Sequence, residues 1–229
     1  MKRILSLISV MLIISVMVFS EEMPKEITIP TEHLSVNTDN QLMYDKVPYT
    51  GKLIATKDVT NELIGEGYMN IKDGHFEGVS YLKSDQILIS FDVKNGKFQG
   101  EYFIKGKFQG NPMNYTIDFD NGIIRKIKGD MQSVELEAVF DSKGKANGTA
   151  IVLGEKLLIK DGFIDKDKFR KKAKMDIEIL LNDTKNGLVT KFYDLNGNLI
   201  YEGRDLKNTD RDAMESILFP VIIHSNNWI

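Results

Sequence analysis

Apolar and polar residues alternate along much of the chain. Three stretches, 87–93, 115–120 and 134–140, carry an apolar residue at every second position. In the middle stretch, Tyr115, Ile117 and Phe119 alternate with Thr116 and Asp118. Successive side chains in a strand point to opposite faces, so this pattern is typical of half-exposed antiparallel strands. It predicts that residues 42–205 are mainly β.

Turn signals separate these stretches at nearly regular intervals. Asp-Gly and Asn-Gly pairs favour two-residue hairpin turns, because both turn positions need a positive φ. Each interval is long enough for one hairpin, and regular spacing indicates a repeat. We therefore expect an elongated antiparallel meander of β-hairpins with a short C-terminal helix. The turn signals are Asp73-Gly74, Asn95-Gly96, Asn121-Gly122 and Lys143-Gly144.

A five-residue unit follows several of these turns. Gly96-Lys97-Phe98-Gln99-Gly100 recurs at 106–110, and related units occupy 74–78 and 144–148. The alternation places Gly100 on the face of Phe98 and Tyr102, so we expect a neighbouring ring over its bare backbone, where an added side chain would collide. The glycines expected to be structural are Gly51, Gly74, Gly78, Gly96, Gly100, Gly106, Gly110, Gly144, Gly148, Gly187, Gly197 and Gly203.

Residues 1–20 are typical of a secretory signal peptide. Two basic residues precede an almost wholly apolar stretch that ends in Val18-Phe19-Ser20, a small-residue cleavage motif. The alternative is an uncleaved membrane anchor, although the stretch is somewhat short for a span of roughly 20 residues. We expect the mature chain to begin at Glu21 and to be exported to the periplasm, the outer surface or the medium.

The remaining boundaries follow from composition. Residues 21–41 are polar and predict an extended leader, so ordered structure should begin near Leu42. The hairpin region is expected to span 42–205. Within it, the charge-rich segment from Ile164 to Met175 is either a short helix or a solvated connection.

Residues 206–229 predict a C-terminal helix and tail. Thr209 followed by Asp212 approximates a capping box. Apolar residues at 214, 217, 218 and 221 follow a helical stripe. Pro220 should end or kink this helix near Leu218 or Phe219.

The units and turns together resemble MORN-type repeats. The resemblance rests on residues 49–52, on the Gly-x-Phe-Glu/Gln-Gly units and on 186–203, and it is strongest to the bacterial YwqK family of antitoxin-type proteins. Gly122 departs from the pattern because no second glycine follows four places on, and Ala146 replaces the Phe. The resemblance implies hairpin architecture, scaffolding, and contacts with protein or membrane lipid.

Composition excludes several classes of site and partner. The chain has no cysteine, so disulfides, thiol catalysis, Cys-based zinc sites and a lipid-modified N-terminal cysteine are ruled out. Residues 1–20 hold Lys2 and Arg3 and no acid, so their removal shifts the formal net charge from −3 to −5. That balance argues against nucleic acid, whose binding needs a basic footprint.

The residues give no recognisable catalytic or metal-binding set. His33, His75 and His224 are far apart and have no metal-ligand spacing, and His75 should face solvent because it follows a turn glycine. We therefore expect no enzyme activity, no metal and no cofactor.

The sequence favours a non-catalytic binding or scaffolding protein of the bacterial cell envelope. Repeat surfaces often bind proteins, so a protein partner is expected, while the net charge does not support membrane contact. One alternative is an antitoxin-like protein that neutralises a partner toxin. Another is an envelope carbohydrate-active hydrolase, which would need two close carboxylates in a pocket. The candidate binding aromatics are Tyr68, Tyr81, Tyr102 and Phe103.

Overall fold

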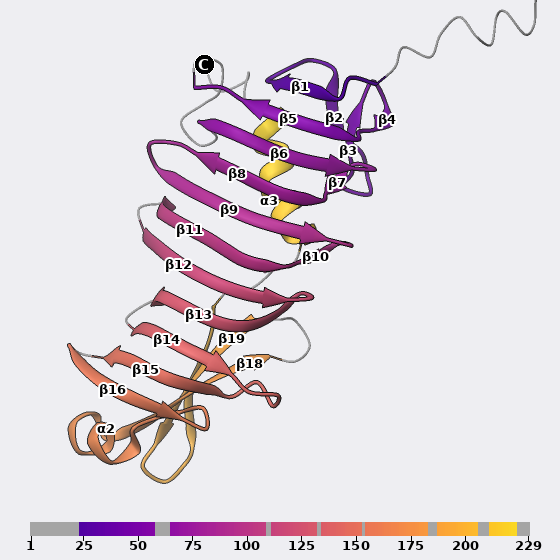
Figure 1. The fold of residues 1–229 in the computed structure, drawn as a ribbon. Coiled ribbons are helices and arrows are strands. Elements are labelled where there is room, and N and C mark those ends of the chain that lie inside the picture. The colour runs from indigo at the N-terminus through magenta and orange to yellow at the C-terminus, as the bar shows by residue number, and fades with distance from the viewer. Residues whose placement is uncertain are drawn as a thin grey trace, which may run out of the picture.

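The computed structural model describes residues 23–57, 65–108, 111–131, 134–152, 154–182, 187–205 and 211–223. Within these ranges the chain is mainly β, as the alternation predicts, and most strands belong to one long sheet (Figure 1). Its strands are β1 (Glu26–Ile29), β5 (Gly51–Ala55), β6 (Glu66–Lys72), β7 (His75–Phe76), β8 (Gly78–Lys83), β9 (Ile87–Lys94), β10 (Lys97–Phe98), β11 (Gly100–Phe108), β12 (Asn111–Asp120), β13 (Ile123–Met131), β14 (Val134–Phe140), β15 (Ala146–Val152), β16 (Glu155–Lys160), β17 (Phe163–Ile164), β18 (Met175–Asn182), β19 (Gly187–Asp194) and β20 (Leu199–Asp205).

From β5 onward the sheet is an antiparallel meander. The short strands β7 and β10 each lead into the next strand, β8 or β11, after a single-residue break at Glu77 or Gln99. Strand β1 differs, because it pairs in parallel with β5. A small antiparallel sheet of β2 (Leu34–Val36), β3 (Leu42–Tyr44) and β4 (Val47–Pro48) lies beside the β5 end. The predicted elongated meander is confirmed (Figure 1).

The sheet folds back at its β16 end. Helix α2 (Lys166–Ala173) joins β17 to β18, and β18 and β19 then pass behind the earlier strands (Figure 1). Backbone hydrogen bonds tie β18 to earlier turns: Leu181 N–H donates to the Gly144 carbonyl at 2.8 Å. Helix α3 (Arg211–Ile223) covers the same side of the sheet, behind β5–β9 (Figure 1). We call this side the covered face and the opposite side the outer face.

The hydrophobic core lies on the covered face. The ring of Phe76 packs 5.0 Å from that of Phe219 on α3 and 5.2 Å from that of Phe91, measured between ring centroids. All three side chains are almost fully buried. The core continues down the sheet through Phe98, Ile117, Ile127, Leu136, Ala150 and Ile159.

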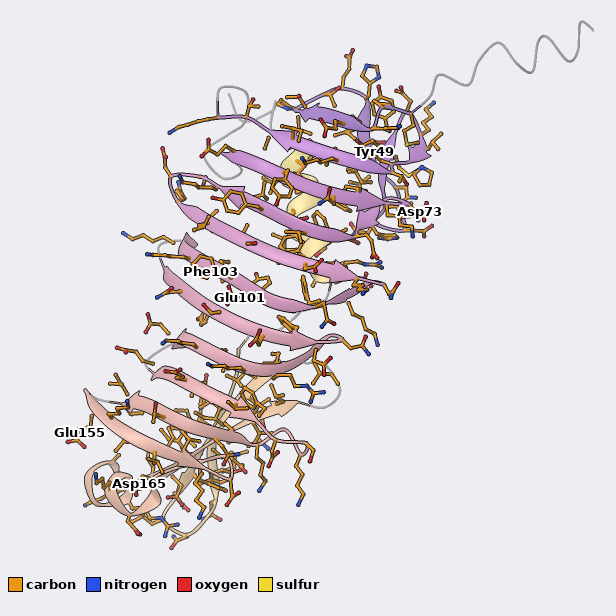
Figure 2. The ribbon with its side chains drawn as sticks, in the orientation of Figure 1. Tyr49, Asp73, Glu101, Phe103, Glu155 and Asp165 are labelled. Carbon is orange, nitrogen blue, oxygen red and sulfur yellow. The ribbon has the colours of Figure 1, made fainter. Side chains whose placement is uncertain are left out.

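The hairpin turns interlock through a repeated pair of hydrogen bonds, which we call the turn ladder. The Phe98 carbonyl accepts from the N–H of Gly122 at 2.8 Å, and Gln99 Oε1 accepts from the N–H of Asn121 at 2.9 Å. The unit at 96–100 thus holds both residues of the following turn. This explains why a side chain with an acceptor oxygen keeps its place in the unit. Equivalent bonds join Tyr49 to Gly74 and Thr50 to Asp73, and Ala146 to Gly162 and Asn147 to Asp161. Figure 2 labels Tyr49 and Asp73 at the β5 end of the sheet.

Gly100 serves backbone conformation and not packing, which corrects the expectation that an added side chain would collide there. Its φ is +67°, and an added Cβ would meet no atom within 4 Å. Gly100 follows the break between β10 and β11, where the chain needs a left-handed residue. Gly106 is the tightly packed glycine, since a Cβ there would lie 2.1 Å from the Gln86 carbonyl oxygen.

The other glycines of the pattern also occupy the sheet and its turns. A Cβ on Gly148 would lie 2.1 Å from the Glu137 carbonyl oxygen, as at Gly106. Gly110 falls outside the described residues. The rest occupy strands or turns at Gly51, Gly74, Gly78, Gly96, Gly144, Gly187, Gly197 and Gly203.

Ordered structure begins before Leu42, contrary to the expectation for residues 21–41. Strand β1 forms there because Ile27 and Ile29 are buried in the core, while Glu26 and Thr28 face solvent. The charge-rich segment forms helix α2, so the helical alternative holds. Residues 1–20 and Thr209 lie outside the described part of the chain.

Helix α3 differs from its prediction in two respects. It continues through Pro220 to Ile223, because Phe219 and Ile222 are buried on either side of the proline and hold the last turn in place. Its buried face comprises Glu215, Phe219 and Ile222, whereas Ile217 of the predicted stripe is exposed. No helix in the described ranges is long and apolar enough to cross a membrane.

Candidate binding surface

A row of side chains crosses the strands on the outer face. The register sets Tyr68 opposite Tyr81, Tyr81 opposite Ser90, and Ser90 opposite Phe103. Directly opposed residues in paired strands share a face, so the three rings lie on one surface. We call Tyr68, Tyr81 and Phe103 the aromatic row; Figure 2 shows Phe103 midway along the sheet. The line continues through Thr116, Lys128, Glu137, Thr149 and Leu158.

The rings of this row are held by neighbours without being enclosed. The Tyr68 and Tyr81 centroids are 6.4 Å apart at an interplanar angle of 32°. Lys52 Nζ lies 4.9 Å from the Tyr68 centroid, a cation–π distance. Tyr68, Tyr81 and Phe103 are each half-buried. Such rings offer a preformed apolar surface with little rotamer entropy left to lose on binding.

Tyr102 does not belong to this surface, which corrects its assignment as a candidate binding aromatic. It precedes Phe103 in β11, so its side chain must point to the opposite face. Its ring lies 5.6 Å from that of Phe98 and 6.2 Å from that of Phe119. Burial raises the pKa of the Tyr102 phenol above its ordinary value. Tyr102 is therefore a core residue.

Charged side chains of opposite sign flank the aromatic row. On the side nearer the Asn-Gly turns, Asp92, Glu101 and Asp118 lie two residues from Ser90, Phe103 and Thr116 along their strands. On the other side, Lys83 and Lys105 lie two residues from Tyr81 and Phe103. A period of two keeps all of these side chains on the outer face. The surface thus has an apolar centre between an acidic margin, where Lys126 lies opposite Asp118, and a second margin that holds Lys105 and the Lys83–Glu66 ion pair at 3.7 Å.

A polar hollow continues the row toward the β16 end. Its volume is about 440 Å³. Glu137 lies within it and forms ion pairs with Lys126 at 3.8 Å and Lys128 at 3.6 Å. Asp130 and Glu135 are directly opposed in β13 and β14. The hollow therefore presents hydrogen-bond donors and acceptors of both charges. It is lined by Asn114, Thr116, Lys128, Gly129, Asp130, Glu135, Leu136, Glu137, Thr149, Ala150, Ile151 and Lys156.

His75 lies in a polar cluster on the covered face, not in solvent as expected. Its Nδ1 is 2.9 Å from Oε2 of Glu215 on α3. Glu215 Oε1 accepts from the Phe76 N–H at 2.7 Å and lies 3.5 Å from Arg211 Nε. Burial raises the pKa of the Glu215 carboxyl, while bonds from His75 and Phe76 act in the opposite direction. These contacts fasten α3 to β7.

Sequence reasoning missed Glu215 because it counted only apolar positions along the helix. The available signal was an acid spaced four residues before Phe219, on one helical face. Its partner His75 is 140 residues away in the chain, so no local pattern could join the two.

Two further features bear on possible chemistry. Among the described residues, no three His, Asp or Glu side chains form a group that could hold a metal ion. Arg170 of α2 binds Asp176 of β18 in a two-pronged ion pair, with nitrogen–oxygen distances of 2.7 and 2.5 Å. This pair anchors α2 to the sheet.

No protein-family model matches this chain, and no solved structure matches it. The similarity to MORN-type repeats accordingly rests on the residues of the units themselves.

Proposed function

We propose that this chain is an exported, non-catalytic binding module of the bacterial cell envelope that contacts a protein partner through the aromatic row. The observation that carries the proposal is the placement of Tyr68, Tyr81 and Phe103 on the outer face, which no described element covers (Figure 1). Aromatic side chains are enriched at protein interfaces and supply much of their binding energy. The core does not require these rings, because the covered face has its own aromatic set.

The charged margins support a protein partner. A partner with basic groups near Glu101 and acidic groups near Lys105 would be steered into one orientation across the row. A polyanion would be repelled by the acidic margin, so nucleic acid is disfavoured.

The sequence of residues 1–20 supports the proposed compartment. A cleaved signal peptide would bring the outer face into contact with envelope proteins or another cell. In the antitoxin-like form of the proposal, the same row would cover a toxin met outside the cytoplasm.

Site-specific photocrosslinking in intact cells, with fractionation, tests the proposal. A crosslinker placed at Thr116 should capture a protein partner in the envelope fraction. The double variant Tyr81→Ser and Phe103→Ser should lose that product while the melting temperature changes little. Val139→Ser is the matched control, since Val139 is 54% exposed on the outer face away from the row.

An undiminished crosslink in the double variant would refute the role of the row. The hydrolase alternative would prevail if purified protein cleaved a glycan and Asp130→Asn or Glu135→Gln abolished turnover without unfolding the chain.

A further inference from the structure

The chain has five Asn-Gly pairs, and this dipeptide can undergo deamidation. The backbone nitrogen of the glycine attacks the side-chain carbonyl carbon of the asparagine, a succinimide ring forms, and ammonia leaves. Glycine favours this step because it has no side chain to hinder the attack and its backbone turns freely. In a folded protein the reaction therefore depends on how firmly the peptide group is held. The pairs begin at Asn95, Asn121, Asn147, Asn186 and Asn196, of which Asn186 lies outside the described residues.

The turn ladder holds Asn121-Gly122 from a neighbouring hairpin. The Gly122 N–H donates to the Phe98 carbonyl at 2.8 Å, and the Asn121 N–H donates to Gln99 Oε1 at 2.9 Å. Attack requires the Gly122 peptide group to rotate, so its bond to Phe98 must break, and the Gln99 bond opposes the wider opening of the turn. This pair can react only when the turn detaches from the hairpin before it, and such an opening is costly.

Two other pairs are also held by distant parts of the chain. Glu77 accepts from both N–H groups of Asn95-Gly96, at 3.0 and 3.4 Å. The Asn147 side chain is itself engaged, because its Oδ1 accepts from the Asp161 N–H at 3.0 Å. Gly148 lies within β15, between β14 and β16. Neither pair can reach the geometry of attack without disturbing a neighbouring strand or turn.

The tip between β19 and β20 is held only by bonds within its own loop. The Gly197 N–H donates to the Asp194 carbonyl at 3.0 Å. Asp194 Oδ1 accepts from the N–H groups of Asn196 and Asn198, both at 2.8 Å. In the described ranges, no residue outside this loop bonds to Asn196 or Gly197, and the Asn196 side chain forms no hydrogen bond. The tip can therefore open by breaking local bonds alone.

Little packing keeps this end of the hairpin closed. Residues 195–201 are exposed without interruption. Strand β20 pairs with β19, and its first three side chains, Leu199, Ile200 and Tyr201, are 52%, 60% and 52% exposed. Segments with few buried contacts open locally at low free-energy cost.

We infer that Asn196-Gly197 is a site of spontaneous deamidation, and that its products loosen the β19–β20 hairpin as the protein ages. The deprotonated Gly197 nitrogen bonds to Cγ of Asn196, and the side-chain nitrogen leaves as ammonia. Water then opens the succinimide to aspartate or isoaspartate. Aspartate places a second negative charge beside the Asp194 carboxylate that holds the tip, and isoaspartate adds a methylene to the backbone. Either product weakens the bonds from Asp194.

Peptide mapping by mass spectrometry tests the site. The purified protein is kept in a mildly alkaline buffer, and the asparagine, aspartate and isoaspartate forms of each pair are quantified over time. Asn196 should react roughly tenfold faster than Asn121, as expected when opening the Asn121 turn breaks about one or two more hydrogen bonds. Equal rates at these two positions, or a faster reaction at Asn95 or Asn147, would overturn the inference.

One variant separates protection by the turn ladder from exposure alone. Gln99→Ala removes the acceptor of the Asn121 N–H, so the reaction at Asn121 should become faster while the rates at Asn95 and Asn196 stay the same. Glu101→Ala, on the outer face of the same hairpin, is the matched control and should change no rate. An unchanged rate at Asn121 in Gln99→Ala would show that the ladder gives no protection.

Hydrogen exchange measures the consequence of the reaction. Backbone amides of β19 and β20 should exchange faster in aged protein than in fresh protein, while those of β8 and β9 should not change. Asn196→Gln, whose longer side chain cyclises much more slowly, should remove this effect of ageing. Unaltered exchange of β19 and β20 after deamidation would refute the loosening. The aromatic row lies on other strands, so this outcome is independent of the proposed function.

Discussion

Gln99 accepts a 2.9 Å hydrogen bond through its Oε1 from the backbone N–H of Asn121, the first residue of the following turn. Glu77 does the same for Asn95 at 3.0 Å, one hairpin earlier. The polar residue of each unit thus belongs to the next turn as much as to its own strand.

Gln99→Ala should destabilise the fold by about 1 kcal/mol, because the Asn121 N–H loses its acceptor. Gln99→Glu should cost less, since Glu77 fills the same role in its own unit. Urea unfolding followed by circular dichroism measures both. Glu101→Ala on the outer face is the control and should have little effect; an equal cost for it would remove the special role of Gln99.

Gly100→Ala and Gly106→Ala should both destabilise the fold, but for different reasons. Asparagine should restore part of the stability only at Gly100. At Gly100 the cost is backbone strain of roughly 1–2 kcal/mol, because φ is +67° and no atom crowds the position. Asparagine tolerates that conformation, so Gly100→Asn should recover part of the loss. At Gly106 the Gln86 carbonyl blocks any Cβ, so Asn should be no better than Ala. Denaturation midpoints decide this, and recovery by Asn at both positions would contradict the assignment.

Glu215→Ala should cost roughly 1–3 kcal/mol, because the buried Phe76 N–H loses its acceptor. Glu215→Gln keeps an acceptor and should cost less. The raised pKa of Glu215 means that its protonated form is favoured in the folded state. The stability that this proton contributes is complete below the pKa of Glu215 in the unfolded state. It is lost as the pH rises through the pKa of the folded state. The stability of the wild type relative to Glu215→Gln should therefore increase as the pH falls from 7 toward the pKa of a free glutamate.

Melting temperatures across that pH range measure the difference. Ser216→Ala, at the neighbouring exposed position, should show a constant difference from wild type. A gap that moves in favour of Glu215→Gln on acidification would show that the carboxyl is held ionised.

The Tyr193 phenol should lose its proton at a higher pH than an ordinary tyrosine. Burial and the hydrogen bond from its hydroxyl to Glu178 Oε2, at 2.8 Å, raise its pKa to about 12. The proton stabilises the folded state below the ordinary tyrosine value, and this contribution disappears as pH rises through about 12. Glu178→Gln should lower the pKa. Difference absorbance of tyrosinate between wild type and variant measures it, and identical titrations would exclude the Glu178 contact.

The sequence predicts turns and strands correctly where residues close together in the chain determine them. Asn95-Gly96 and the period of two around Ile89 define a turn and a strand within a few residues, and the structure has both. Tyr102 and Phe103 are both candidates for the binding surface by residue type, but adjacent strand residues face opposite ways, so strict alternation separates them. Two contacts lay beyond any local pattern: the parallel pairing of β1 with β5, and the contact of His75 with Glu215. Both depend on the path of the whole chain.

The turn ladder has a direction. Each acceptor, such as Gln99, sits on the hairpin that precedes the turn it holds. The chain emerges from the ribosome amino terminus first, so the acceptors for each turn are synthesised before the turn that they bind. Assembly can follow the order of synthesis, one hairpin at a time, and a duplicated hairpin could join the array by using the acceptors already in place.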